Sequence, residues 1–223
     1  MQLGPGSRLL DVACGTGASA LWVAERTGCE VLGIDLSAAN VAQAGAQAAR
    51  RGLAARARFA VADAEALQCA AASFDALLCE CAWCTFPDKA AAAAEFQRVL
   101  KPAGRLAISD LTRVAAPLPQ LDGLLAWVAC IADAQPLERY AQLLRAAGFE
   151  QLQCEERSAC LRELVQQVRG RLALLEVLIG LGKLEAPGLD VPQARATLLA
   201  ADAAIRAGEL GYAVLLARRP PAP

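Results

Sequence analysis

A turn of small residues near the N-terminus is the feature that most constrains the fold of this chain. Residues 8–12 are predicted to form a short buried strand, and the turn 13–17, Ala-Cys-Gly-Thr-Gly, ends that strand before a helix begins at Ala18. The spacing is G-x-G-x-x-A, and Asp35 ends a second apolar strand 20 residues after Gly15. This pattern is typical of an open α/β sheet that binds a nucleoside, because glycines allow close backbone approach and the carboxylate can accept hydrogen bonds from both ribose hydroxyls.

Strand and helix patterns alternate through most of the remaining sequence. We therefore expect one domain, residues 1–223, with a doubly wound, mainly parallel seven-stranded α/β sheet of the Rossmann-like type. About 50 helix-prone residues near the C-terminus, about 159–207, are expected to form a helical insertion or cap. The predicted strands cover residues 8–12, 30–35, 57–61, 73–80, 105–110, 149–156 and 211–217, and the predicted helices cover 18–26, 38–51, 89–100, 121–132 and 137–147.

Composition excludes several classes of function. The net charge is -1 with both signs interspersed, so no basic surface for nucleic acid is expected. No apolar run is long enough to span a membrane and no secretory leader is visible, so we expect a cytoplasmic protein. Nine cysteines, an odd number in a chain of this size, indicate reduced thiols. There is no histidine, which removes the commonest metal ligand and general base, and no metal is expected.

Acidic residues favour a cationic nucleoside ligand over a dinucleotide. Asp11 ends the first strand four residues before Gly15, where a carboxylate would repel a pyrophosphate but attract an ammonium group. The start of the following helix offers free N–H groups to a carboxylate of the same ligand. Asp63 follows the third strand, where its side chain could accept a hydrogen bond from an adenine amino group.

Five motifs, in this order and spacing, resemble those of the class I S-adenosylmethionine-dependent methyltransferases of the type 11/25 kind. They are Leu9–Gly17, Gly33–Ser37, Ala62–Ala64, Ser73–Ala76 and Arg98–Leu106, and they extend over about half of the chain. The resemblance implies S-adenosylmethionine as the cofactor and methyl transfer to a small molecule as the activity. Alanine stands at positions 13 and 103, where the family pattern often has glycine.

The resemblance also assigns roles to individual residues. It implies that the glycine turn holds the methionine end of the cofactor, that Asp35 binds the ribose, that Leu36 packs on the adenine, and that Asp63 with the backbone of Ala64 contacts the adenine edge. The full set of expected cofactor residues is Asp11, Ala13, Gly15, Gly17, Asp35, Leu36, Asp63, Ala64 and Cys79.

Three thiols and a carboxylate cluster where the fourth strand ends, at Cys79-Glu80-Cys81-Ala82-Trp83-Cys84. Cys81 and Cys84 have a C-x-x-C spacing that could bind a soft metalloid, and the segment through Asp110 distantly resembles the arsenite methyltransferases. We therefore name Glu80, Cys81 and Cys84 as candidate catalytic residues, for a thiol or metalloid acceptor. The alternatives are that the cysteines are small apolar packing residues and that Glu80 is an acceptor on the cofactor side, not a general base.

Two other functions fit the same sequence. One is a nicotinamide-dependent oxidoreductase on a related fold, and the other is a non-catalytic partner subunit that has kept its cofactor site. Members of the family usually have helices ahead of the first strand that cover the cofactor, whereas only a few residues precede it here. Segments at about 112–135 and 159–207 could close the site in their place. A homodimer is compatible with the sequence.

Overall fold

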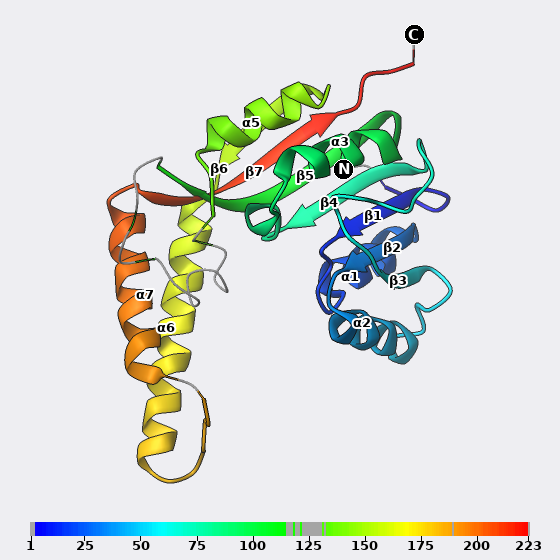
Figure 1. Cartoon of the computed structure of the whole chain (residues 1–223). Coiled ribbons are helices and arrows are strands. Elements are labelled where there is room, and N and C mark those ends of the chain that lie inside the picture. Colours follow the sequence, from blue (N-terminus) through cyan, green and yellow to red (C-terminus); the bar gives the residue numbers. More distant parts are fainter. Residues whose placement is uncertain are drawn as a thin grey trace. The chain divides into compact units, whose positions relative to one another are not determined.

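A seven-stranded sheet forms the centre of the fold in the computed structural model, which describes residues 3–114, 118, 121, 131, 133–188 and 190–222. The strand order is β3-β2-β1-β4-β5-β7-β6, and β7 runs against the direction of β4 (Figure 1). This confirms the predicted Rossmann-like α/β fold. The strands are β1 (Arg8–Val12), β2 (Glu30–Asp35), β3 (Ala57–Val61), β4 (Phe74–Glu80), β5 (Leu100–Arg113), β6 (Glu150–Glu156) and β7 (Leu210–Arg218).

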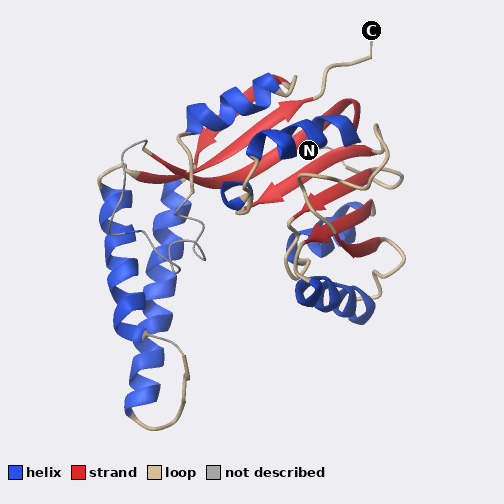
Figure 2. Ribbon diagram, in the orientation of Figure 1, coloured by secondary structure: helices blue, strands red, loops and turns tan. Residues whose placement is uncertain are grey.

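Helices connect most of these strands (Figure 2). None of the helices in the described part of the chain is long and apolar enough to cross a membrane. The helix predicted over 121–132 lies almost wholly outside the described residues. The helices are α1 (Ala18–Thr27), α2 (Ala38–Arg50), the 3-10 turn η1 (Trp83–Thr85), α3 (Lys89–Val99), α5 (Leu137–Ala146), α6 (Ser158–Gly180) and α7 (Val191–Arg206).

The chain divides into two compact units, each assembled from separate stretches of sequence. Unit 1 contains the glycine turn and consists of Met1–Asp110, Glu138–Cys154 and Val214–Pro223. Unit 2 consists of Leu111–Leu137 and Glu155–Ala213. The expectation of a single domain over residues 1–223 stays a prediction.

Unit 2 contains a helical hairpin at the place of the expected insertion. The buried carboxylate of Asp202 on α7 accepts hydrogen bonds at 3.4 Å from Arg169 on α6 and at 3.1 Å from Arg206 on its own helix. Two guanidinium groups compensate the burial of this charge, so the ion pairs tie α6 to α7.

Parallel pairing brings the ends of three strands to one edge of the sheet. β1 pairs with β2 on one side and with β4 on the other, and Asp11 is opposite both Gly33 and Leu78. The carboxyl ends of parallel strands share an edge, which is where open α/β sheets bind ligands. The acidic residues Asp11, Asp35 and Glu80 therefore lie at this edge, inside unit 1.

The glycines at positions 17 and 33 are needed for packing. A Cβ atom on Gly33 would lie 2.5 Å from Cδ1 of Phe59, and one on Gly17 would lie 2.9 Å from Cζ of the same ring. The ring of Phe59 on β3 therefore occupies space that only two glycines leave free. It also keeps the glycine turn close to the end of β2.

We expect Gly33→Ala to lower the free energy of unfolding by ~1–3 kcal/mol, because the new methyl group overpacks a tight part of the core. Urea unfolding at constant pH measures this. Gly45→Ala is the matched control: Gly45 lies in α2 and a Cβ there would meet nothing within 4 Å, so the control should gain ~0.5–1 kcal/mol in stability. Equal effects in the two variants would contradict the packing explanation.

Candidate active site

Asp35 holds the glycine turn in place. Its Oδ2 accepts a hydrogen bond from the backbone N–H of Gly15 at 2.8 Å, and its Oδ1 accepts from the N–H of Ser37 at 2.8 Å and from Nδ2 of Asn40 at 3.3 Å. An ionised carboxylate offers about four acceptor positions, so one position on Oδ2 is left for a ligand hydroxyl. The residue that closes the loop can thus also bind a ribose.

A cavity of about 280 Å³ lies beside Asp35. Its lining includes five predicted cofactor residues, and Leu36, one of them, is 71% exposed. The carboxylates on the lining are those of Asp35, Asp63 and Glu65. The complete lining is Ala13, Ile34, Asp35, Leu36, Ala62, Asp63, Ala64, Glu65, Ala82, Thr85, Phe86 and Pro87.

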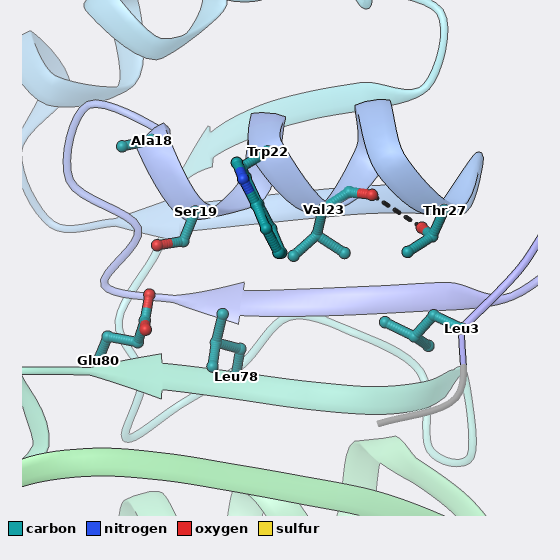
Figure 3. A pocket seen from close by; sticks show the side chains of 8 residues that line it. All are labelled: Leu3, Ala18, Ser19, Trp22, Val23, Thr27, Leu78 and Glu80. Carbon is teal, nitrogen blue, oxygen red and sulfur yellow. Dashed lines mark hydrogen bonds between the residues drawn. The ribbon is translucent and has the colours of Figure 1, made fainter. Parts of the chain in front are cut away.

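A second cavity, of about 520 Å³, runs as a groove between α1 and β4 (Figure 3). Glu80 and Ser19 lie at one end of this groove and Leu3 lies at the other, with an apolar wall between them. Trp22, on that wall, is 55% exposed. The complete lining is Leu3, Ala18, Ser19, Trp22, Val23, Thr27, Leu78 and Glu80. Among the described residues, no lysine or arginine lines either cavity, so the combined site is acidic.

Asp11 is the most unusual titratable group of the site. It is 2% exposed, and its Oδ2 has no hydrogen-bond partner among the described residues. Burial, then the negative charge of Glu80, raise the pKa of Asp11 to about 7, while a hydrogen bond from the backbone of Ala20 and the charge of Asp35 have smaller effects of opposite sign. A buried carboxylate oxygen without a partner is costly, and a cation from a ligand would compensate it.

The start of α1 completes a site for a molecule of mixed charge. The helix begins after Gly17, which has no side chain to cap it, and the backbone of Ala20 in its first turn donates a hydrogen bond to Asp11. The N–H groups of Ala18 and Ser19 have no acceptor within the helix and can donate to an anion, next to the unpartnered oxygen of Asp11. A Cβ atom on Gly15 would meet nothing within 4 Å, so the backbone of the turn is open to a ligand. Ammonium and carboxylate groups of an amino acid fit this arrangement, and the methionine end of S-adenosylmethionine carries both.

The turn after β4 is fixed by buried contacts. The backbone N–H of Cys84 donates to Oδ2 of the fully buried Asp110 at 2.8 Å. The ring of Trp83, also fully buried, lies 5.0 Å from that of Tyr140 on α5, and its Nε1 donates to the carbonyl of Lys89. Asp110 therefore holds the loop at residue 84 in place.

The three thiols near this turn differ in accessibility. Cys79 and Cys84 are fully buried, whereas Cys81 is exposed and has a left-handed φ of 51°. Burial, followed by the charges of Asp110 and Asp11, raises the pKa of Cys79 well above its ordinary value. Within the described part of the chain, no three His, Cys, Asp or Glu residues come together as a metal site.

The structure brings together only some of the predicted site residues. Ala13, Asp35, Leu36, Asp63 and Ala64 line the smaller cavity, and Glu80 lines the groove. Asp11, Gly15, Gly17, Cys79, Cys81 and Cys84 line neither cavity, although Asp11, Gly15 and Gly17 shape the turn between them. The roles of all twelve stay predictions. Several lining residues were not predicted as site residues, among them Trp22, Glu65 and Thr85. Ser19, the second residue of the helix after the glycine turn, was the easiest to find from its place.

Comparison with known proteins identifies the family. A family model described as a methyltransferase domain matches residues 10–108. The 27-O-demethylrifamycin SV methyltransferase of Amycolatopsis mediterranei (strain S699) is 30% identical over 227 residues, which cover 99% of this chain and 80% of that protein. The chain belongs to the class I S-adenosylmethionine-dependent methyltransferases. Its cofactor is S-adenosylmethionine, as expected from the motifs, and the alternative of a nicotinamide-dependent oxidoreductase is not supported.

Two further relatives show the breadth of the family. Phosphoethanolamine N-methyltransferase 3 of Arabidopsis thaliana is 32% identical over 158 residues, which cover 71% of this chain but 32% of the plant protein. The chain thus spans about a third of the length of that relative. The crystal structure of the [4+2]-cyclase SpnF matches with a TM-score of 0.79 and 30% identity, covering 99% of this chain and 78% of that one. This fold therefore does not fix the reaction or its acceptor.

The alanines that replace family glycines both have left-handed backbone. Ala13 has a φ of 54° and Ala103 a φ of 60°. A left-handed conformation costs an L-residue roughly 1–2 kcal/mol, and glycine avoids that cost while adding some entropy to the unfolded chain. We expect Ala13→Gly to raise the free energy of unfolding by ~0.5–1 kcal/mol. In chemical denaturation, the control Ala46→Gly, at an exposed position of α2, should instead lose ~1 kcal/mol.

Cofactor affinity should depend on the ionisation of Asp11. An ionised Asp11 attracts the ammonium group, so affinity for S-adenosylhomocysteine should rise with pH, by up to about tenfold per unit, until the pH passes about 7. The free protein should show the opposite trend in stability, which falls as the pH rises from about 4 to about 7, because the folded state holds this proton more tightly than the unfolded state.

Isothermal calorimetry and urea unfolding at a series of pH values measure the two trends. Asp11→Asn is the control: its affinity should be weaker and nearly independent of pH over this range. A wild-type protein and an Asp11→Asn variant with parallel pH profiles would contradict the role of Asp11.

Proposed function

We propose that this methyltransferase methylates an acidic hydroxyl group, such as a phenol or enol, on a small organic molecule. The observation that carries the proposal is similarity along nearly the whole chain to enzymes named for oxygen methylation of small molecules. Besides the rifamycin enzyme, the O-methyltransferase resE of Aspergillus sclerotiorum is 29% identical over 96% of this chain and 76% of that protein. The phosphoethanolamine N-methyltransferases match over a much smaller share of their own length.

The side chains of this chain favour an acidic hydroxyl over an aliphatic alcohol. An alcohol must lose its proton during methylation, and the sequence contains no histidine to accept it. Asp110 is fully buried and already accepts the N–H of Cys84. Because a phenol or enol ionises near neutral pH far more readily than an alcohol, it needs little help from the protein.

The residues of the site supply orientation and exclusion of water. When bound, S-adenosylmethionine supplies a methyl group on a positively charged sulfur atom. Asp35 would hold the ribose, Leu36 would cover the adenine, and Asp11 with the start of α1 would hold the methionine end. The turn after β4 would form a wall beside this donor, because Trp83 and Asp110 anchor the turn in the core.

A thiol or metalloid acceptor is the second candidate. Its support is Cys81, which is exposed at the carboxyl end of β4. Cys84 is fully buried, so a chelate between the two thiols would require the turn to open. The expected cytoplasmic location and a homodimer also stay predictions.

A screen for S-adenosylhomocysteine formation tests the proposal. The acceptors are phenols of graded pKa, aliphatic alcohols, ethanolamine phosphate, small thiols and arsenite. We expect turnover with phenols, and values of kcat/KM that rise as the pKa of the phenol falls. Mass spectrometry of the product locates the new methyl group on oxygen.

Other outcomes of this screen identify the alternatives. Turnover with arsenite or thiols that is lost in Cys81→Ser, with cofactor affinity unchanged, would favour the second candidate. A protein that binds S-adenosylhomocysteine but methylates none of the acceptors, alone or with fractionated lysate, would favour the non-catalytic partner subunit.

A further inference from the structure

Glu80 is the charged residue among the described residues that line the groove. It ends β4, it is exposed, and it lines the groove along α1 (Figure 3). In that view its carboxylate points toward the start of α1, where Ser19 lies. Leu78, two residues earlier on the same strand, faces the same groove. Glu80 therefore faces the helix whose N-terminus is open to an anion.

Glu80 and Asp11 form a pair of carboxylates on neighbouring strands. The charge of Glu80 acts on Asp11 more strongly than that of Asp35 does, and both charges oppose the ionisation of Asp11. Oδ2 of Asp11 has no hydrogen-bond partner among the described residues. No lysine or arginine of the described residues lines the groove or the adjoining cavity. A cation between the two carboxylates would relieve their repulsion and give Oδ2 a partner.

A carboxylate group of the ligand can also bind beside this pair of acidic residues. The N–H groups of Ala18 and Ser19 and the hydroxyl of Ser19 can donate to a carboxylate. An acidic pair next to a helix N-terminus matches an α-amino acid, in which ammonium and carboxylate are attached to one carbon. The methionine end of the cofactor is such a group.

We propose that Glu80 binds the ammonium group of the cofactor's methionine end together with Asp11, as a second carboxylate for the same cation. This inference rests on the cofactor assignment and is independent of the acceptor proposed above. It makes Glu80 a residue of cofactor recognition and not the general base. The pair selects ligands that keep the free amino group.

Binding of two ligands tests this role. One is S-adenosylhomocysteine, and the other is its deaminated analogue, which lacks only the amino group. Calorimetry should show that Glu80→Gln weakens binding of S-adenosylhomocysteine about tenfold, because a charged hydrogen bond is lost. Affinity for the deaminated analogue should stay the same or increase, because the carboxylate of Glu80 no longer repels the remaining carboxylate of the ligand.

Glu25→Gln is the matched control. It removes the same charge from an exposed residue of α1 that pairs with Arg51 and lines neither cavity. It should leave both affinities unchanged, which separates a local effect from a change in net charge.

Three results would overturn the inference. Equal weakening of both ligands by Glu80→Gln would assign Glu80 a structural role. Unchanged affinities with a lower kcat and an altered pH profile would assign it the role of general base. A wild-type protein that binds neither S-adenosylhomocysteine nor S-adenosylmethionine would reject the cofactor assignment itself, whereas failure of the hydroxyl acceptor alone would leave this inference standing.

Discussion

The hydrogen bond between Asp35 and the N–H of Gly15 is the interaction on which the site depends. It joins the end of β2 to the turn that follows β1, and so fixes the position of the glycine turn relative to the cavity beside Asp35. The parallel pairing of β1 with both β2 and β4 places the remaining acidic groups along the same edge. This hydrogen bond and the register of β1 with its two neighbours thus determine where a ligand with both positive and negative groups can bind.

Much of this arrangement is predictable from local sequence patterns. Most strand and helix boundaries agree with the pattern of apolar residues within one or two positions, because most of the elements bury apolar residues on one face. The position of Asp35 follows from its spacing to the glycine turn. Long-range geometry is what local patterns miss: Asp110 is 26 residues from the Cys84 amide that it holds. The burial of Cys79 and Cys84, in contrast to Cys81, is likewise decided by which way the turn after β4 packs.

The residues in and beside the turn are small for different physical reasons. Gly17 and Gly33 leave space for the ring of Phe59, whereas Gly15 faces open space that a ligand can fill. Ala13 adopts the left-handed backbone without the advantage of glycine. The small residues of this motif therefore serve different purposes: some allow close packing, one leaves access for a ligand, and one is under backbone strain.

Unit 1 is discontinuous in sequence, and this affects how the protein can fold during synthesis. The unit needs residues 138–154 and the last ten residues of the chain besides its first 110. Trp83, beside the site, has its aromatic partner only once Tyr140 has been made. The stretch matched by the family model, residues 10–108, therefore makes up only a part of unit 1. During synthesis, the cofactor-binding half of this enzyme can complete its fold only once β7 has been made.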